Sequence, residues 1–105
     1  MKILLDACVP RPLRKFLPAH AVHTAQELGW GKLKNGALLR EAESQCDALV
    51  TSDQNLKYQQ NMGGRKLAIL VLPTNDWTTI RGRTDEIAVK LAGLQPGDFV
   101  ELDWD

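Results

Sequence analysis

The 105-residue sequence predicts an α/β fold with a central, mainly parallel sheet of about five strands and helices on both faces. Short apolar segments alternate with segments whose apolar residues recur at helical spacing, as in sheets built from right-handed crossovers. Several apolar segments are continuous, which is typical of strands covered on both faces. The length allows one core, so we expect a single domain over residues 1–105.

The first half of the chain contains three of the predicted strands. Lys2–Asp6 is a continuous apolar run that ends in a turn signal, as a buried strand does. Pro10–Leu17 has apolar residues at helical spacing and basic residues elsewhere, which predicts an amphipathic helix. His20–Thr24 is the second predicted strand. Asn35 is predicted to cap a helix that extends to Gln45, and Asp47–Ser52 contains the third strand.

The second half contains the other two strands. Residues 54–61 are polar and are predicted to form a helical turn. Lys66–Leu72 is the most apolar predicted strand. Asp76–Leu94 is predicted to be one long helix, weakened at Gly82. Phe99–Trp104 alternates and is rich in acids, which favours a strand at the edge of the sheet.

The charge and the cysteines limit the classes of protein that fit. The net charge is zero, which argues against holding nucleic acid by bulk electrostatics, but the first 34 residues carry six basic and two acidic side chains. No apolar run approaches the ~20 residues of a membrane helix, and we see no signal peptide. Cys8 and Cys46 fit no disulfide framework. We expect a soluble cytoplasmic protein with reduced thiols.

Two aspartates end two of the most buried predicted strands. Asp6 ends the first and Asp53 follows the third. Ligands of parallel sheets bind beyond the carboxyl ends of the strands, and neighbouring strands ~5 Å apart would bring the carboxylates together. Such a pair suits a bound Mg²⁺ or Mn²⁺. Aspartate is also a common turn former, so the residues alone leave a metal site and two turn caps equally open.

Other site motifs are absent or incomplete in the sequence. No glycine-rich dinucleotide or P-loop pattern occurs, and no G-x-S-x-G nucleophile motif is present. His20 and His23 lack partners at zinc spacing. Trp30, Trp77 and Trp104 are spread along the chain and are predicted to pack in or beside the core rather than to stack on bases.

Four segments together resemble a known family. They are MKILLDACVPRPLRKFLP, ELGWGKLKNGALLREAE, DALVTSDQNLKYQQN and LAILVLP. Their order and spacing are similar to those of the DUF5615 family of PIN-like proteins, small relatives of the PIN-domain ribonucleases that are often toxins encoded beside an antitoxin. The resemblance implies a PIN-like three-layer fold with an acidic pocket that holds Mg²⁺ or Mn²⁺ and hydrolyses RNA phosphodiesters.

The resemblance assigns roles to particular residues. Relatives usually begin LLDENLP, and the first aspartate falls on Asp6, while the aspartate of their TTD block falls on Asp53; both would be catalytic metal ligands. The acid in the KDG block of these relatives falls on Asn35. Asparagine keeps a side-chain carbonyl oxygen at this catalytic position but carries no charge. Ala7 and Cys8 replace a Glu-Asn pair. The pocket therefore has less negative charge, and weaker Mg²⁺ binding is expected.

Further residues and partners follow from the same comparison. Asp76 is a candidate additional carboxylate, although it also fits as the cap of the long helix. Phosphate contacts with RNA, which would be salt-dependent and largely non-specific, are expected from Arg11, Arg14, Lys15, Lys32, Lys34 and Lys57. The implied partners are an RNA substrate and a cognate antitoxin, and an exposed edge strand is compatible with a homodimer.

Three hypotheses follow from the sequence. The leading one is a metal-dependent ribonuclease that is the toxin of a toxin–antitoxin pair. The second is a catalytically weakened PIN-like protein that binds RNA or a partner protein, motivated by Ala7, Cys8 and Asn35. The third is a receiver-like protein that is phosphorylated on Asp6 or Asp53. This hypothesis is weakened because the chain lacks the paired acids at the first strand that would hold Mg²⁺ for phosphoryl transfer.

Overall fold

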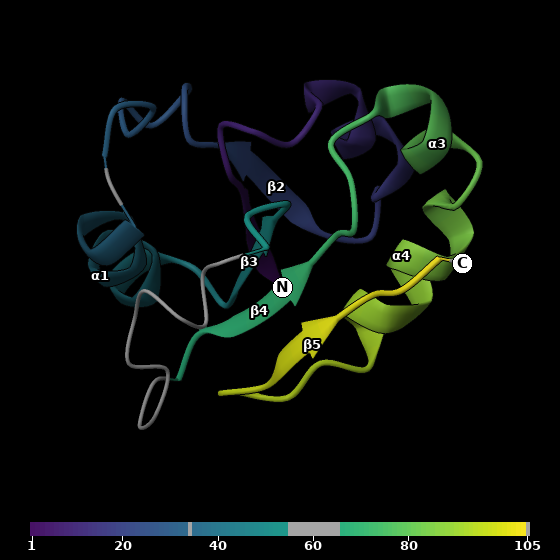
Figure 1. The fold of residues 1–105 in the computed structure, drawn as a ribbon. Helices are drawn as coiled ribbons and strands as arrows, with labels where there is room; N and C mark the ends of the chain where they lie inside the picture. Colours follow the sequence, from purple (N-terminus) through teal and green to yellow (C-terminus); the bar gives the residue numbers. More distant parts are fainter. Residues whose placement is uncertain (34, 55–65, 105) are drawn as a thin grey trace.

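A computed structural model describes residues 1–33, 35–54 and 66–104 and shows an α/β fold built on one sheet (Figure 1). The five described strands all run parallel and are ordered β2-β1-β3-β4-β5. They are β1 (Lys2–Leu5), β2 (Ala21–Thr24), β3 (Ala48–Thr51), β4 (Ala68–Val71) and β5 (Phe99–Glu101). The helices are the 3₁₀-helix η1 (Arg11–Phe16), α1 (Asn35–Gln45), α3 (Trp77–Arg81) and α4 (Thr84–Ala92). The predicted fold class is confirmed.

The order of the strands reverses beside β1. The chain passes from β1 to β2 on one side and later enters β3 on the other side, so that Leu5 lies opposite Thr24 of β2 and Val50 of β3. In open parallel sheets, this reversal creates a crevice beyond the carboxyl ends of the strands, and ligands bind there. The carboxyl ends of β1 and β3 are therefore the first place to look for a site.

The core lies on both faces of the sheet, as the continuous apolar strands predict. Side chains alternate between the faces along each strand, so both sets must be apolar when both faces are covered. One face packs against η1, α3 and α4, and its cluster includes Ile3, Leu5, Val50, Leu70, Leu13, Leu17, Ile80, Ile87 and Leu91. The other face packs against α1, and its cluster includes Leu4, Leu49, Ile69, Leu38, Leu39 and Ala42.

The helix expected over Pro10–Leu17 is a shorter 3₁₀-helix. Its backbone bonds span three residues, from the Leu13 amide to the Pro10 carbonyl and from the Leu17 amide to the Arg14 carbonyl, both at 3.2 Å. Pro12 within the segment has no amide hydrogen, and flanking prolines leave no room for another turn. Leu17 is buried, whereas Phe16, another of the apolar residues at helical spacing in this segment, is 43% exposed.

The prediction of a single long helix over Asp76–Leu94 is wrong, because the chain forms two shorter helices, α3 and α4, instead. Gly82 ends α3, and its amide donates to the Thr79 carbonyl at 3.2 Å. Glycine is the residue least able to continue a helix except proline, so the break falls at the predicted weak point. Asp76 caps α3 as expected, since its Oδ2 accepts hydrogen bonds from the backbone amide and the hydroxyl of Thr79.

The last strand lies at the edge of the sheet, as predicted, but it is shorter than predicted. β5 is shorter than the predicted strand Phe99–Trp104, and it lies at the edge because only β4 pairs with it. Among the described helices, none is long and apolar enough to cross a membrane.

The two faces of α4 are expected to differ sharply in their contribution to stability. Leu91 is fully buried and Val89 is 70% exposed. Leu91→Ala is expected to lower the free energy of unfolding by about 2–5 kcal/mol, because it leaves a cavity, whereas Val89→Ala is expected to change it by less than about 0.5 kcal/mol. Urea unfolding of both variants measures the difference, and equal losses would show that α4 does not pack as described.

Candidate functional site

Asp6 directly follows β1 and is fixed by three hydrogen bonds at the edge of the sheet. Its amide donates to the Val50 carbonyl of β3 at 2.9 Å. One carboxylate oxygen, Oδ1, accepts from the Ala7 amide at 2.7 Å, and the other, Oδ2, accepts from the Thr51 hydroxyl at 2.8 Å. Each carboxylate oxygen can accept more than one hydrogen bond or metal contact. Asp6 therefore stabilises the local turn and can still bind a ligand.

Thr51, the last residue of β3, links the two aspartates. Its side chain is fully buried. The hydroxyl donates to Asp6 and accepts a hydrogen bond of 3.1 Å from the Asp53 amide. Sequence reasoning overlooked this residue, although a threonine at the end of the aliphatic run Ala-Leu-Val-Thr was the available signal.

Asp53 lies two residues beyond β3 and is half-buried. Since β1 and β3 are neighbours, Asp6 and Asp53 follow adjacent strands at the same edge of the sheet, which is the arrangement on which the predicted carboxylate pair depended. Parallel neighbours are ~4.8 Å apart. The topology thus brings the two aspartates to the crevice where strand order reverses.

Other polar groups complete this edge. The Ser52 hydroxyl donates to the Cys8 sulfur at 3.0 Å, and that sulfur lies 3.8 Å from the Thr51 hydroxyl. Cys8 is exposed. From the turn after β2, the Gln26 amide group donates to the Ala7 carbonyl at 3.5 Å. Side chains from the segments after three strands therefore meet here.

The donor set fits a hydrated cation better than a fully protein-bound one. Among the described residues, no group of three or more His, Cys, Asp or Glu side chains is placed to hold a metal ion. Two carboxylates can still bind Mg²⁺, which keeps several of its waters. α1 begins at Asn35, but the side chain of Asn35 lies outside the described part of the structure. Its predicted roles as a cap and as a catalytic residue stay predictions.

Asp76 lies farther along the same edge. Besides capping α3, it lines a pocket of about 280 Å³ beyond the ends of β4 and β5, together with Pro73, Thr74, Thr79, Asp103 and Trp104. This pocket contains neither Asp6 nor Asp53. The use of Asp76 as an additional carboxylate therefore stays a prediction.

The predicted RNA-binding residues differ in their surroundings. Arg14 forms an ion pair with Glu27, whose carboxylate also accepts a 2.8 Å hydrogen bond from the Thr24 amide. The hydrogen bond from the Thr24 amide is the largest effect on the pKa of Glu27 and lowers it; burial opposes it, and the charge of Arg14 adds to the lowering, so that the pKa lies below its ordinary value. Lys34 and Lys57 lie outside the described residues.

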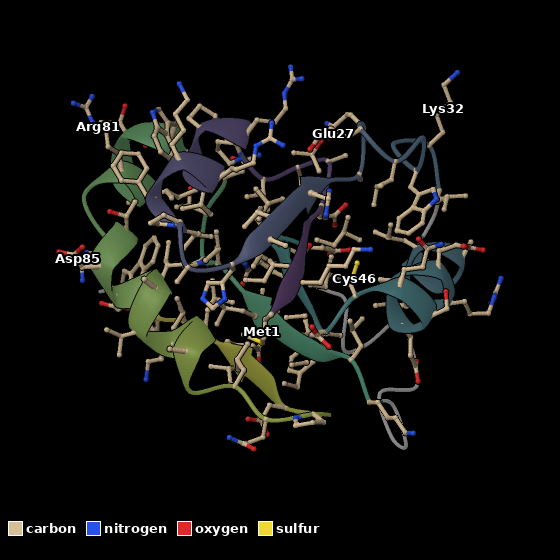
Figure 2. The ribbon with its side chains drawn as sticks, turned by 180° about the vertical axis from the view of Figure 1, so that it is seen from behind. Met1, Glu27, Lys32, Cys46, Arg81 and Asp85 are labelled. Atoms are coloured by element: carbon tan, nitrogen blue, oxygen red, sulfur yellow. The ribbon has the colours of Figure 1, made fainter. Side chains whose placement is uncertain are left out.

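Three of the predicted basic residues, Arg11, Lys15 and Lys32, are exposed. Within the described chain, no ion pair engages any of them. Figure 2 shows Lys32 and Glu27 along the upper edge of the molecule, with Met1 well below them. Positive charge is therefore available on the edge that carries Asp6.

A second cavity, of about 400 Å³, lies at the amino ends of the strands. Its lining includes Met1, Cys46, Asp47 and Lys66. Burial raises the pKa of the Cys46 thiol. Sequence reasoning did not find this cavity because residues that come before several different strands form it. It is separated from Asp6 by the length of the sheet.

The fold and the edge described above define a parallel α/β protein with two aspartates at the point where strand order reverses. No family model matches the chain, and no curated protein or solved structure matches it. The resemblance to PIN-like proteins stays a prediction that rests on the four sequence segments.

Removing the hydroxyl of Thr51 is expected to destabilise this edge. Thr51→Val removes the hydroxyl that accepts from the Asp53 amide and donates to Oδ2 of Asp6, which is expected to cost about 1–3 kcal/mol of unfolding free energy. Thr51→Ser keeps the hydroxyl and is expected to lose less than half as much. Chemical denaturation measures both, and equal losses would mean that the methyl group matters and the hydroxyl does not.

Glu27 is expected to make stability depend on pH. Its pKa in the folded protein is below the ordinary value of 4.5, so its charge stabilises the fold above that pH and this contribution is lost as the pH falls through the folded pKa. Glu27→Gln is therefore expected to lower Tm at pH 7 and to change it less at pH 3. Glu41→Gln, at an exposed position of α1, is the matched control for the loss of one surface carboxylate.

Proposed function

We propose that this protein is a metal-dependent ribonuclease that hydrolyses RNA phosphodiesters at the carboxyl edge of β1 and β3. The observation that carries the proposal is the position of Asp6 and Asp53 at the ends of these adjacent strands, connected through the Thr51 hydroxyl. Free basic side chains on the same edge and the resemblance of the four segments support RNA as the substrate.

The carboxylates of Asp6 and Asp53 would hold Mg²⁺ or Mn²⁺. A bound cation of this kind neutralises charge on the scissile phosphate and lowers the pKa of the attacking water. The Thr51 hydroxyl fixes the rotation of the Asp6 carboxylate, because its donated hydrogen bond selects one oxygen. A remaining lone pair of the Asp6 carboxylate would then orient a water molecule. Arg11 and Lys32 would neutralise neighbouring phosphates.

More specifically, we propose that the protein is a cytoplasmic toxin controlled by a cognate antitoxin protein. It rests on the resemblance to PIN-like proteins. Inducing the wild-type chain should arrest bacterial growth, inducing Asp53→Asn should not, and co-expression of the protein encoded by the adjacent gene should restore growth. Growth arrest by Asp53→Asn would contradict a toxin that acts through this site.

A second candidate function is binding of RNA or a partner protein without efficient cleavage. It is favoured by the lack of a third metal-binding side chain among the described residues and by Ala7 and Cys8 at positions where relatives carry Glu and Asn. Isothermal titration with Mn²⁺ separates the two candidates. Stoichiometric binding that Asp53→Asn removes favours the nuclease, and the absence of binding favours the second candidate.

Cleavage is expected to require both aspartates. With Mn²⁺ and a structured RNA, Asp6→Asn and Asp53→Asn should each lower the cleavage rate at least about 100-fold, because each removes a negative charge that holds the cation. Asp85→Asn removes an exposed carboxylate from the first turn of α4 and should cleave at the wild-type rate. Equal cleavage by wild type and both site variants would rule the proposal out.

A further inference from the structure

An aromatic pair with exposed basic neighbours forms a distinct surface where η1 meets α3. The rings of Phe16 and Trp77 contact each other with centroids 5.8 Å apart and planes inclined at 49°. Trp77 also packs against the core, which holds it in place, whereas Phe16 is 43% exposed. Lys15 precedes Phe16, and Arg81 lies one helical turn after Trp77 on α3. We call these four residues the aromatic–basic patch.

The two cations of the patch are available to an external partner. Lys15 and Arg81 are exposed, and no ion pair engages either one within the described residues. Two other arginines are occupied, since Arg14 pairs with Glu27, and Arg83 pairs with Glu86 and lies 5.6 Å from the centre of the Trp104 ring. The patch therefore combines positive charge that is not ion-paired among the described residues with a partly exposed aromatic ring.

The patch lies on the edge of the molecule that carries the candidate site. In Figure 1, η1, the dark purple coil, and α3 stand side by side on the side towards which the strands point. Figure 2 shows Arg81 and Lys32 at the two ends of one edge, with Glu27 between them. The segment that leads to η1 begins at Asp6. The segment that leads to α3 begins at Leu72, whose amide donates a hydrogen bond to the Thr51 carbonyl. A strand of RNA on the patch would therefore lie along the edge that holds Asp6.

We propose that the aromatic–basic patch binds single-stranded RNA, with an unpaired base stacked on Phe16 and the adjoining phosphates contacted by Lys15 and Arg81. The inference rests on the proposed function and adds where, and in which form, the substrate is held. Aromatic side chains stack on any base whose face is free, and cations beside them contact the phosphates. Paired bases have no free face, so a duplex gains nothing from Phe16.

The size of the apolar surface favours a base over a protein partner. Stable protein interfaces bury about 800 Å² on each side and have an apolar centre. The other exposed large hydrophobic residues among those described, Met1, Leu33 and Val89, lie outside η1 and α3. One exposed ring next to two free cations fits the dimensions and charge of a nucleotide.

Binding of a labelled, unstructured 12-nucleotide RNA, followed by fluorescence anisotropy in EDTA, tests the proposal without cleavage. Phe16→Ala and Phe16→Leu are expected to raise Kd about 5- to 150-fold, because both remove the stacking face, whereas Phe16→Tyr should bind like wild type. Val89→Ala removes a more exposed apolar side chain from α4 and should not change Kd. Circular dichroism establishes that each variant is folded.

The charged residues have a separate signature. Lys15→Ala and Arg81→Ala should each reduce the slope of log K against log salt concentration by about 0.7, the value for one single-strand phosphate contact. Lys90→Ala, at an exposed position in the last turn of α4, should leave the slope unchanged. Equal reductions in all three variants would show that the field of the whole protein, and not the patch, attracts the RNA.

The proposal is overturned if Phe16→Ala binds the RNA within twofold of wild type, or if a duplex binds as tightly as the single strand. A Phe16→Ala variant that binds RNA normally but changes the sedimentation coefficient would identify the patch as a protein interface. Failure here is distinct from failure of the proposed function. Asp53→Asn should keep the Phe16-dependent binding while losing cleavage, and cleavage that persists in Phe16→Ala with unchanged Kd would reject only the patch.

Discussion

The parallel pairing of β1 with β2 on one side and β3 on the other determines where every polar group of the candidate site lies. Asp6 follows β1, Gln26 follows β2, and Ser52 and Asp53 follow β3, so all four lie at one edge of the sheet. An antiparallel arrangement would have placed some of them at the opposite end. The hydrogen bond from the Asp6 amide to the Val50 carbonyl extends this pairing by one residue and positions the first aspartate beside Thr51.

Asp6 shows that the two explanations of a strand-end aspartate are compatible. One oxygen bonds to the Ala7 amide, as a turn former does, and the other bonds to the Thr51 hydroxyl. Because each oxygen can accept a second partner, the turn and the ligand site do not compete for the same lone pair. The local hydrogen bonds instead hold the carboxylate in one orientation, which is a condition for binding a cation with few protein ligands.

The sequence predicted best those features that depend on continuous apolar runs. All five strands were predicted within a few residues, because buried parallel strands are apolar on both faces, and the strands that Asp6 and Asp53 follow are neighbours, as the carboxylate-pair hypothesis required. Gly82 was predicted only as a weak point within one continuous helix, whereas the helix ends there. Whether a weak helical residue ends a helix depends on what both halves pack against, which one sequence does not contain.

The features that the sequence did not predict arise from tertiary contacts. Thr51 gained a role because the register of β1 and β3 puts its hydroxyl beside Asp6. Leu13, Phe16 and Leu17 have the apolar spacing of an α-helix, but a 3₁₀-helix has a different period, so Leu13 and Leu17 are buried and Phe16 is exposed. The exposed ring of Phe16 follows from this difference in helix type.

A neutral protein can still present a strongly polarised edge, and the distribution of ion pairs explains how. Glu27 neutralises Arg14 and Glu86 neutralises Arg83, whereas Arg11, Lys15, Lys32 and Arg81 are free of ion pairs in the described chain. The acids that balance the total charge include Asp98, which directly precedes β5, and Glu101, the last residue of β5. This strand lies at the edge of the sheet farthest from β2. Net charge alone therefore does not describe this edge, because salt screens each charge beyond ~10 Å and the local balance of charge sets the local potential.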